Sequence, residues 1–126
     1  MGDWEGRPWH KIEVDNPDEY AAFMNDPWKN PYLGGESYSV VLNRIQPVLM
    51  KLLKDHPDKT IAVVAHQVVN RSFIAETMNI DRPSARSIKQ SNTGINVFNY
   101  NHDDNELNVV SVNGDFHLRD IDRPVD

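Results

Sequence analysis

The chain has 126 residues, which fits one domain over residues 1–126, and its 13 Lys and Arg against 19 Asp and Glu give a formal net charge of −6. This acidic balance argues against a nucleic-acid or membrane-surface role that rests on bulk charge. The absence of cysteine excludes a disulfide framework and a thiolate metal site, and it favours a reducing, cytoplasmic location. No apolar run approaches the roughly 20 residues that a membrane helix needs, so we expect no membrane partner.

Two amphipathic helices are predicted in the first half of the chain. Asn16 is a typical N-cap, Pro17 suits the first helical position, and the helix should end at Asp26, which precedes another proline. Ser37 is a plausible N-cap for the longest helical pattern, which closes at His56.

Residues 61–65 form an unbroken apolar run rich in β-branched side chains, which predicts a strand buried on both faces in the middle of an α/β sheet. His66 follows this run directly, and a helix of roughly three turns begins there. Side chains at the carboxyl end of such a strand line the crevice in which α/β proteins bind ligands. His66, Gln67 and Arg71 bring an imidazole, an amide and a fixed cation to that place, a combination that suits an anion.

The last third of the chain predicts a hairpin. Residues 94–100 alternate in polarity, residues 101–105 form a polar turn, and residues 107–112 form a second strand candidate. The fold class is therefore α/β, with about three strands and three to four helices. A doubly buried strand needs more neighbours than this chain supplies, so the sheet is either small or incomplete.

Each candidate site residue also has a purely structural interpretation. His66 could be a strand-end histidine satisfied by backbone groups, and Arg71 a surface arginine on an amphipathic helix. Tyr38 follows a helix cap, and it could instead lie on the rim of the site. Asn92 and Thr93 precede a strand, where they form either a turn or a pair of donors that approach an oxyanion.

The remaining histidines predict no metal site. None of them shows the spacing of a metal-binding pair, and the chain has no glycine-rich phosphate loop and no Gly-x-Ser-x-Gly elbow. We therefore expect no metal and no cofactor.

Four blocks of the sequence together resemble the histidine phosphatase superfamily, whose fold is phosphoglycerate-mutase-like. Residues 2–6 resemble the family's Gly-x-Trp-Glu-Gly, and residues 35–37 with Arg44 resemble its Gly-Glu-Ser followed by an arginine. Residues 65–71 resemble its second-histidine motif, and residues 92–95 resemble its late Asn-Cys/Thr-Ser/Gly segment. The resemblance covers nearly the whole chain. It implies a three-layer α/β sandwich of which this chain is the incomplete, C-terminal part.

The resemblance also implies a ligand. Most members have His-Gly where this chain has His66 and Gln67, whereas the fructose-2,6-bisphosphatase branch has His-Gln. In that branch the residues that correspond to Gln67, Arg71 and Tyr38 contact substrate. The implied partner is a phosphorylated small molecule or free phosphate, and no metal is needed because the family's phosphoryl acceptor is a histidine.

The family's Arg-His-Gly motif does not occur in these 126 residues. The resemblance implies that its nucleophilic histidine, its phosphate-binding arginines and its general-acid glutamate belong before the block at residues 2–6. We therefore expect the full-length form to hydrolyse phosphate monoesters through a phosphohistidine. This chain would carry only the second-histidine half of the site, with His66 in an electrostatic role, and would be inactive alone.

Two alternatives remain. The chain could be a non-catalytic anion-binding or interaction module of the same fold, or a soluble α/β domain of unrelated function. Since missing strands leave apolar surface exposed, we also expect a homodimer or a partner chain that completes the sheet.

Overall fold

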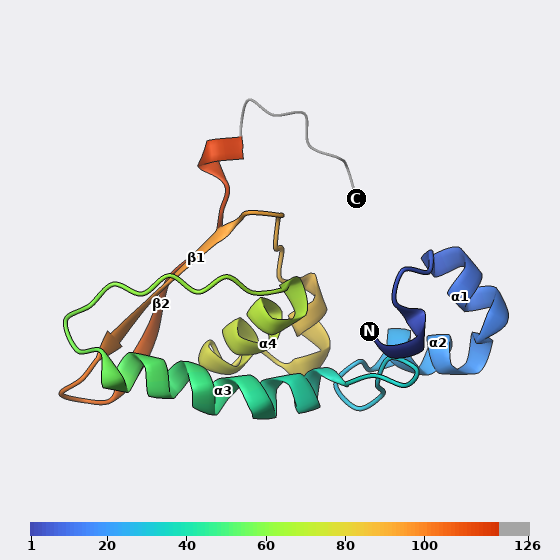
Figure 1. Cartoon of the computed structure of the whole chain (residues 1–126), viewed down its shortest axis with the longest axis horizontal. Helices are drawn as coiled ribbons and strands as arrows, with labels where there is room; N and C mark the ends of the chain where they lie inside the picture. The colour runs from blue at the N-terminus through green and yellow to red at the C-terminus, as the bar shows by residue number, and fades with distance from the viewer. Residues whose placement is uncertain (119–126) are drawn as a thin grey trace.

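The computed structural model describes residues 1–118. Helices and one two-stranded antiparallel sheet form an α/β fold, which confirms the predicted class (Figure 1). The elements in chain order are the 3-10 helix Gly2–Trp4, α1 (Trp9–Asp15), α2 (Pro17–Asn25), α3 (Tyr38–Asp55), α4 (Gln67–Thr77), the 3-10 helix Arg82–Ser87, β1 (Ile95–Asn101), β2 (Glu106–Gly114) and the 3-10 helix Phe116–Leu118. Among these helices, none is long and apolar enough to cross a membrane.

The first part of the chain folds around Trp4, which has no exposed surface. Its ring packs edge to face against Phe23 and Tyr32, with centroids 5.7 and 6.1 Å apart. Its Nε1 donates to Asn16 Oδ1 at 3.3 Å, which ties the first turn to the start of α2. The predicted helix start is confirmed, although Asn16 uses its side chain for this bond and makes no cap hydrogen bond.

Helix α1 was not predicted from the sequence. This helix has seven residues and buries only Ile12, so its sequence lacks the repeated apolar spacing that marks longer amphipathic helices.

The long helix α3 begins as predicted. Ser37 is its N-cap, and the Ser37 Oγ accepts a hydrogen bond from the Val40 N–H at 3.3 Å. The helix continues through Pro47 and buries Val41 and Ile45, and it packs against α4.

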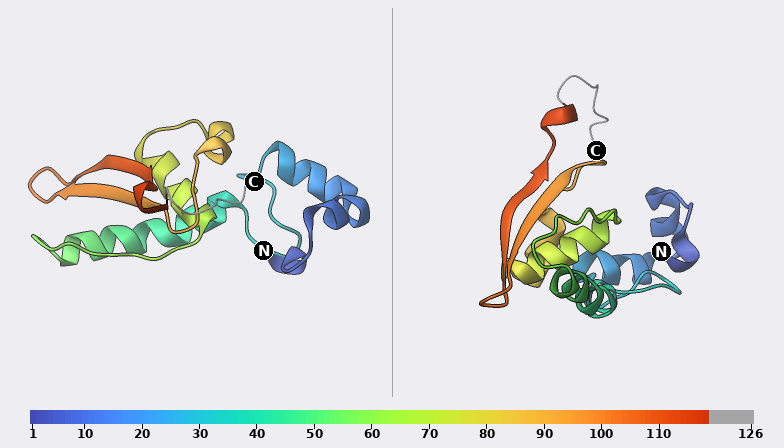
Figure 2. Two further views of the ribbon diagram at one scale, coloured as in Figure 1. Left: turned by 90° about the horizontal axis from the view of Figure 1, so that it is seen from above. Right: turned by 60° about the vertical axis from the view of Figure 1, so that its left-hand side comes forward.

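The predicted hairpin is confirmed. β1 and β2 pair antiparallel, with Phe98 opposite Val109 and register irregularities between Ile95 and Phe98. Phe98 packs on Phe73 of α4 at a centroid distance of 5.3 Å, so the hairpin lies against that helix (Figure 2).

The prediction of a doubly buried strand at residues 61–65 is wrong. The segment pairs with no strand in the described part of the chain, where the sheet has two strands and not three. Val64 is 100% exposed and Val63 is 53% exposed. A strand is stabilised by hydrogen bonds to neighbouring strands, and β1 and β2 pair with each other instead. The segment therefore runs back along α3 to the start of α4 without joining the hairpin (Figure 1).

Candidate functional site

A cavity of about 430 Å³ is lined by residues of α1, α2, the following loop and the beginning of α3 and α4, together with Arg86. Its wall includes three of the residues that the sequence singled out, Tyr38, Gln67 and Arg71. Aromatic side chains from α1, α2 and the following loop form another part of the wall, together with Arg86. Its size is in the range of small-molecule sites, which measure roughly 300–1,000 Å³.

The beginning of α4 positions the first polar groups. His66 is the N-cap residue, with extended backbone angles, and its imidazole is exposed and makes no cap hydrogen bond. The first intrahelical bond runs from the Asn70 N–H to the His66 carbonyl, so the preceding N–H groups of the helix remain available. These groups and the helix dipole favour an anion near His66 and Gln67. His66 itself is not among the residues that line the cavity.

Gln67 and Arg71 lie side by side because they are one helical turn apart. Arg71 Nη1 donates to Gln67 Oε1 at 3.1 Å, and Arg71 Nε donates to the Ile88 carbonyl at 2.9 Å. Gln67 Nε2 in turn donates to the Gln90 carbonyl at 3.2 Å. A guanidinium has five N–H donors, so Arg71 keeps further donors for a ligand in the cavity that it lines.

Two buried phenols lie beside these donors. Tyr32 is 8% exposed and Tyr38 is 3% exposed. Burial raises the pKa of the Tyr32 phenol well above its usual value, and the neighbouring Tyr38 phenol raises it further, whereas the cations of Arg86 and Arg71 lower it. Tyr32 therefore stays protonated at neutral pH, and its phenol is hydrogen-bonded to that of Tyr38.

Arg86 is a cavity residue that the sequence did not reveal. Its Nη1 donates to the Met24 carbonyl at 2.7 Å, across 62 positions of the chain. No motif marks this arginine, because its place depends on how the 3-10 helix Arg82–Ser87 packs against the end of α2. The lining of the cavity includes no carboxylate that would neutralise Arg71 or Arg86.

Asn92 and Thr93 are not brought to the cavity. Asn92 is exposed, and Thr93 has a positive φ of 61° in the turn before β1. The Thr93 carbonyl lies 3.0 Å from His117 Nε2. Their predicted contact with phosphate stays a prediction.

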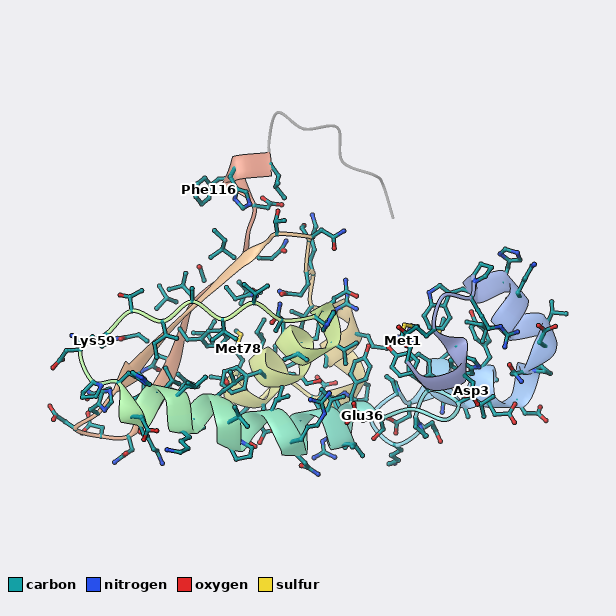
Figure 3. All side chains as sticks on the ribbon, viewed as in Figure 1. Met1, Asp3, Glu36, Lys59, Met78 and Phe116 are labelled. Carbon is teal, nitrogen blue, oxygen red and sulfur yellow. The ribbon has the colours of Figure 1, made fainter. Side chains whose placement is uncertain are left out.

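The Glu36–Arg44 pair fixes the loop that leads into α3. Arg44 Nε and Nη2 donate to the two Glu36 carboxylate oxygens at 2.7 and 2.9 Å. These hydrogen bonds hold the pKa of Glu36 below its usual value. Figure 3 shows Glu36 where the loop meets α3, two residues before Tyr38, so the pair helps to set where Tyr38 enters the cavity wall.

Within residues 1–118 no group of three or more His, Asp or Glu side chains is arranged to hold a metal ion. The donors at the cavity are cationic or neutral N–H and O–H groups, which match a phosphate better than a cation.

The chain is similar to known proteins in sequence and in fold. The sequence profile described as histidine phosphatase superfamily (branch 1) matches residues 1–113. Fructose-2,6-bisphosphatase of Saccharomyces cerevisiae is 34% identical over 76 residues, which are 60% of this chain and 16% of that protein. Phosphoserine phosphatase 1 of Hydrogenobacter thermophilus is 26% identical over 120 residues, which are 93% of this chain and 57% of that protein.

Solved structures share the fold. YhfR of Bacillus stearothermophilus superposes with a TM-score of 0.79 at 22% identity, over 90% of this chain and 55% of its own. A phosphoserine phosphatase of Entamoeba histolytica, solved with 3-phosphoglyceric acid, gives a TM-score of 0.77 at 24% identity, over 93% of this chain and 58% of its own. The chain therefore spans little more than half of these structures, and relative to them its fold is incomplete. With its profile match over residues 1–113, the chain belongs to the histidine phosphatase superfamily.

Proposed function

We propose that this chain supplies the second-histidine half of a site that binds phosphate monoesters. The observation that carries the proposal is the convergence of Tyr38, Gln67 and Arg71 on one cavity whose wall includes no carboxylate. In this proposal Arg71 and Gln67 bind the phosphate oxygens, and the Tyr38 phenol orients the ester. His66 lies at the start of α4 and adds an imidazole beside the same oxygens.

Asn92 and Thr93 are secondary phosphate donors in this proposal. The turn that they form leads directly into β1, and it is exposed, so both side chains are accessible to a ligand.

Phosphoryl transfer needs several kinds of group, and this chain supplies only some of them. Phosphoryl transfer needs a nucleophile in line with the leaving oxygen, a proton donor for that oxygen, and cationic donors around the equatorial oxygens. Arg71, Gln67 and the first N–H groups of α4 serve the equatorial oxygens. The chain contains no Arg-His-Gly, so we propose that a full-length form hydrolyses phosphate monoesters through a phosphohistidine and that this chain alone does not.

The names of the relatives support the ligand class. Both a fructose-2,6-bisphosphatase and a phosphoserine phosphatase act, by name, on phosphorylated small molecules. The chain also contains no cysteine, which fits the cytoplasmic location that we include in the proposal.

The test is an NMR titration of the 126-residue chain with inorganic phosphate. We expect saturable shifts of backbone amides at the start of α4, and about tenfold weaker binding in Arg71→Gln, because a charge-assisted hydrogen bond is lost. Arg82→Gln is the matched control, since Arg82 is exposed, lies over the Trp28 ring and does not line the cavity. Absence of saturable shifts in the wild type, or an unchanged affinity in Arg71→Gln, would refute the proposed site.

A second candidate function is a non-catalytic anion-binding or interaction module, and one observation favours it. The apolar side chains of residues 61–65 are largely exposed, and this extended segment pairs with no strand among residues 1–118. We propose that a second copy or a partner chain adds a strand here and completes the sheet. Light scattering at micromolar concentration tests the self-association version, which predicts a dimer and is contradicted by a monodisperse monomer.

A further inference from the structure

The side-chain amide of Gln67 is held at both of its ends. Its Nε2 donates to the Gln90 carbonyl at 3.2 Å, and its Oε1 accepts from Arg71 Nη1 at 3.1 Å. Because a carbonyl only accepts and a guanidinium only donates, these two partners determine which end of the amide faces which group. Gln67 is an exposed residue, so the orientation of its amide depends on where the Gln90 carbonyl lies.

The side chain of Gln90 is paired with Asn96, near the start of β1. Asn96 Nδ2 donates to Gln90 Oε1 at 2.8 Å, and Gln90 Nε2 donates to Asn96 Oδ1 at 3.0 Å and to the Lys89 carbonyl at 2.8 Å. Both Gln90 and Asn96 are partly buried. Since each amide gives a donor and an acceptor to the other, the pair fixes the backbone at Gln90 relative to the hairpin.

An irregularity in the hairpin adds a contact from β2. The register between the strands is irregular from Ile95 to Val97, and Asn113 on the facing part of β2 has a positive φ of 52°. The Asn113 N–H donates to Asn96 Oδ1 at 2.9 Å, and Asn113 Oδ1 accepts from the Ser91 N–H at 2.6 Å. Both strands therefore hold the segment that carries the Gln90 carbonyl.

We infer that Asn96 is a positioning residue for the phosphate site, and that it acts through Gln90 on the Gln67 amide. The inference rests on the proposed function, because it assumes that Gln67 and Arg71 bind the phosphate. With the Gln90 carbonyl fixed, Gln67 keeps Oε1 on Arg71 and has one N–H of Nε2 left for a phosphate oxygen. Without that carbonyl the exposed amide is free to rotate, and ordering it again on binding costs free energy.

The alternative role for Asn96 is to stabilise the hairpin alone. In that case its loss would lower the free energy of unfolding, and any effect on phosphate binding would not depend on Gln67. The contact of Arg71 with the Ile88 carbonyl, at 2.9 Å, does not involve the paired amides, so loss of the pair should act on Gln67 first. The test therefore compares the effect of Asn96 with and without the Gln67 side chain.

The experiment is an NMR titration of the 126-residue chain with inorganic phosphate. Asn96→Ala should bind phosphate about fivefold more weakly than the wild type, because one released side chain must be ordered on binding. In the phosphate-free chain, its Gln67 side-chain amide signals should move towards those of a free glutamine, which a loss of stability alone would not cause. Asn99→Ala is the matched control, since Asn99 lies on the exposed face of the same strand, and it should bind phosphate like the wild type.

A second variant approaches the pair from its other member. Gln90→Met removes the paired amide without changing the charge, and it keeps the bond from the Asn113 N–H to Asn96 within the hairpin. The same weakening is expected, so this variant serves if Asn96→Ala does not fold. In a Gln67→Ala background, Asn96→Ala should cause no further weakening, because the group on which it acts is absent.

Three outcomes would overturn the inference. If Asn96→Ala and Gln90→Met bind phosphate like the wild type, the positioning role is refuted while the phosphate site stands. If Asn96→Ala weakens binding equally with and without the Gln67 side chain, Asn96 does not act through Gln67. If the wild type binds no phosphate, the proposed function fails and the positioning role fails with it.

Discussion

At the scale of single residues, Trp4 has the largest expected effect on stability. It is fully buried, packs on Phe23 and Tyr32, and donates to Asn16. Trp4→Ala should lower the free energy of unfolding by about 3–5 kcal/mol, because the change removes a large buried ring and leaves a cavity. Urea denaturation followed by circular dichroism measures this loss.

Trp9→Ala is the matched control for that measurement. Trp9 contacts the same aromatic cluster, with Phe23 among its neighbours, but it is 44% exposed. Trp9→Ala should lower the free energy of unfolding by clearly less than Trp4→Ala does, because less apolar surface returns to water. Equal losses in the two variants would contradict the role of Trp4 as the centre of this cluster.

The Glu36–Arg44 pair predicts a pH dependence of stability. Because the folded-state pKa of Glu36 lies below its unfolded value of about 4.3, the pair adds stability above that pH. The contribution is lost as the pH falls through the lower, folded-state pKa. It should be small and sensitive to salt, since both side chains are more than one-third exposed.

Urea midpoints of the wild type and Glu36→Gln at pH 7 and pH 3 measure this contribution. The wild type should lose more stability than the variant between the two values, and 1 M salt should narrow the difference. If the two proteins lose stability in parallel at low salt, the pair does not contribute.

Some residues of the cavity wall could be predicted from the sequence, and others could not. Gln67 and Arg71 could be placed together because a separation of four positions on a helix is a local relation. Tyr38 could be placed at a helix start because Ser37 is a recognisable cap. Arg86 could not be found, because its hydrogen bond to Met24 joins segments 62 positions apart and no local pattern encodes that packing.

At the scale of elements, the same distinction between local and non-local relations holds. The helices α2, α3 and α4 and the hairpin were predicted from caps, periodicity and alternation, which act over a few residues. The strand at residues 61–65 was predicted from its composition alone, yet strand formation depends on hydrogen bonds to neighbouring strands. The described residues supply no such neighbour for it.

A substitution at Val64 tests the role of the exposed segment at residues 61–65. Because Val64 is fully exposed, Val64→Lys should change the free energy of unfolding of the isolated chain by no more than about 0.5 kcal/mol. If a second strand pairs with residues 61–65, the same substitution should weaken that association, since charged side chains on a strand edge oppose pairing.

Urea denaturation and sedimentation velocity measure the two effects of Val64→Lys. A large loss of stability in the monomer would mean that Val64 is buried in the folded chain. An unchanged assembly, if the wild type does associate, would exclude this segment as the interface.

At the scale of the whole molecule, the cavity lies between two parts of the chain. The aromatic cluster around Trp4 forms one end, and the long helix with α4 and the hairpin forms the other (Figures 1 and 2). The cavity is lined by residues of both parts, so a change in their packing would alter the distance between Arg86 and Arg71.

The family could be predicted from four short motifs, and the motif at residues 65–71 includes two residues of the cavity wall, Gln67 and Arg71. The motifs do not say how much of the fold this chain contains. It covers 55% of one solved relative and 58% of another. This partial coverage agrees with the exposed, unpaired segment at residues 61–65.

The central claim, that this chain carries a phosphate-binding half-site without a complete catalytic centre, is tested most directly by hydrolysis of a phosphate monoester. The purified 126-residue chain and His66→Ala are incubated with 4-nitrophenyl phosphate, and release of nitrophenol is followed. We predict rates indistinguishable from the buffer background for both proteins. Turnover by the wild type well above background, lost in His66→Ala, would contradict the half-site and show a complete catalytic centre.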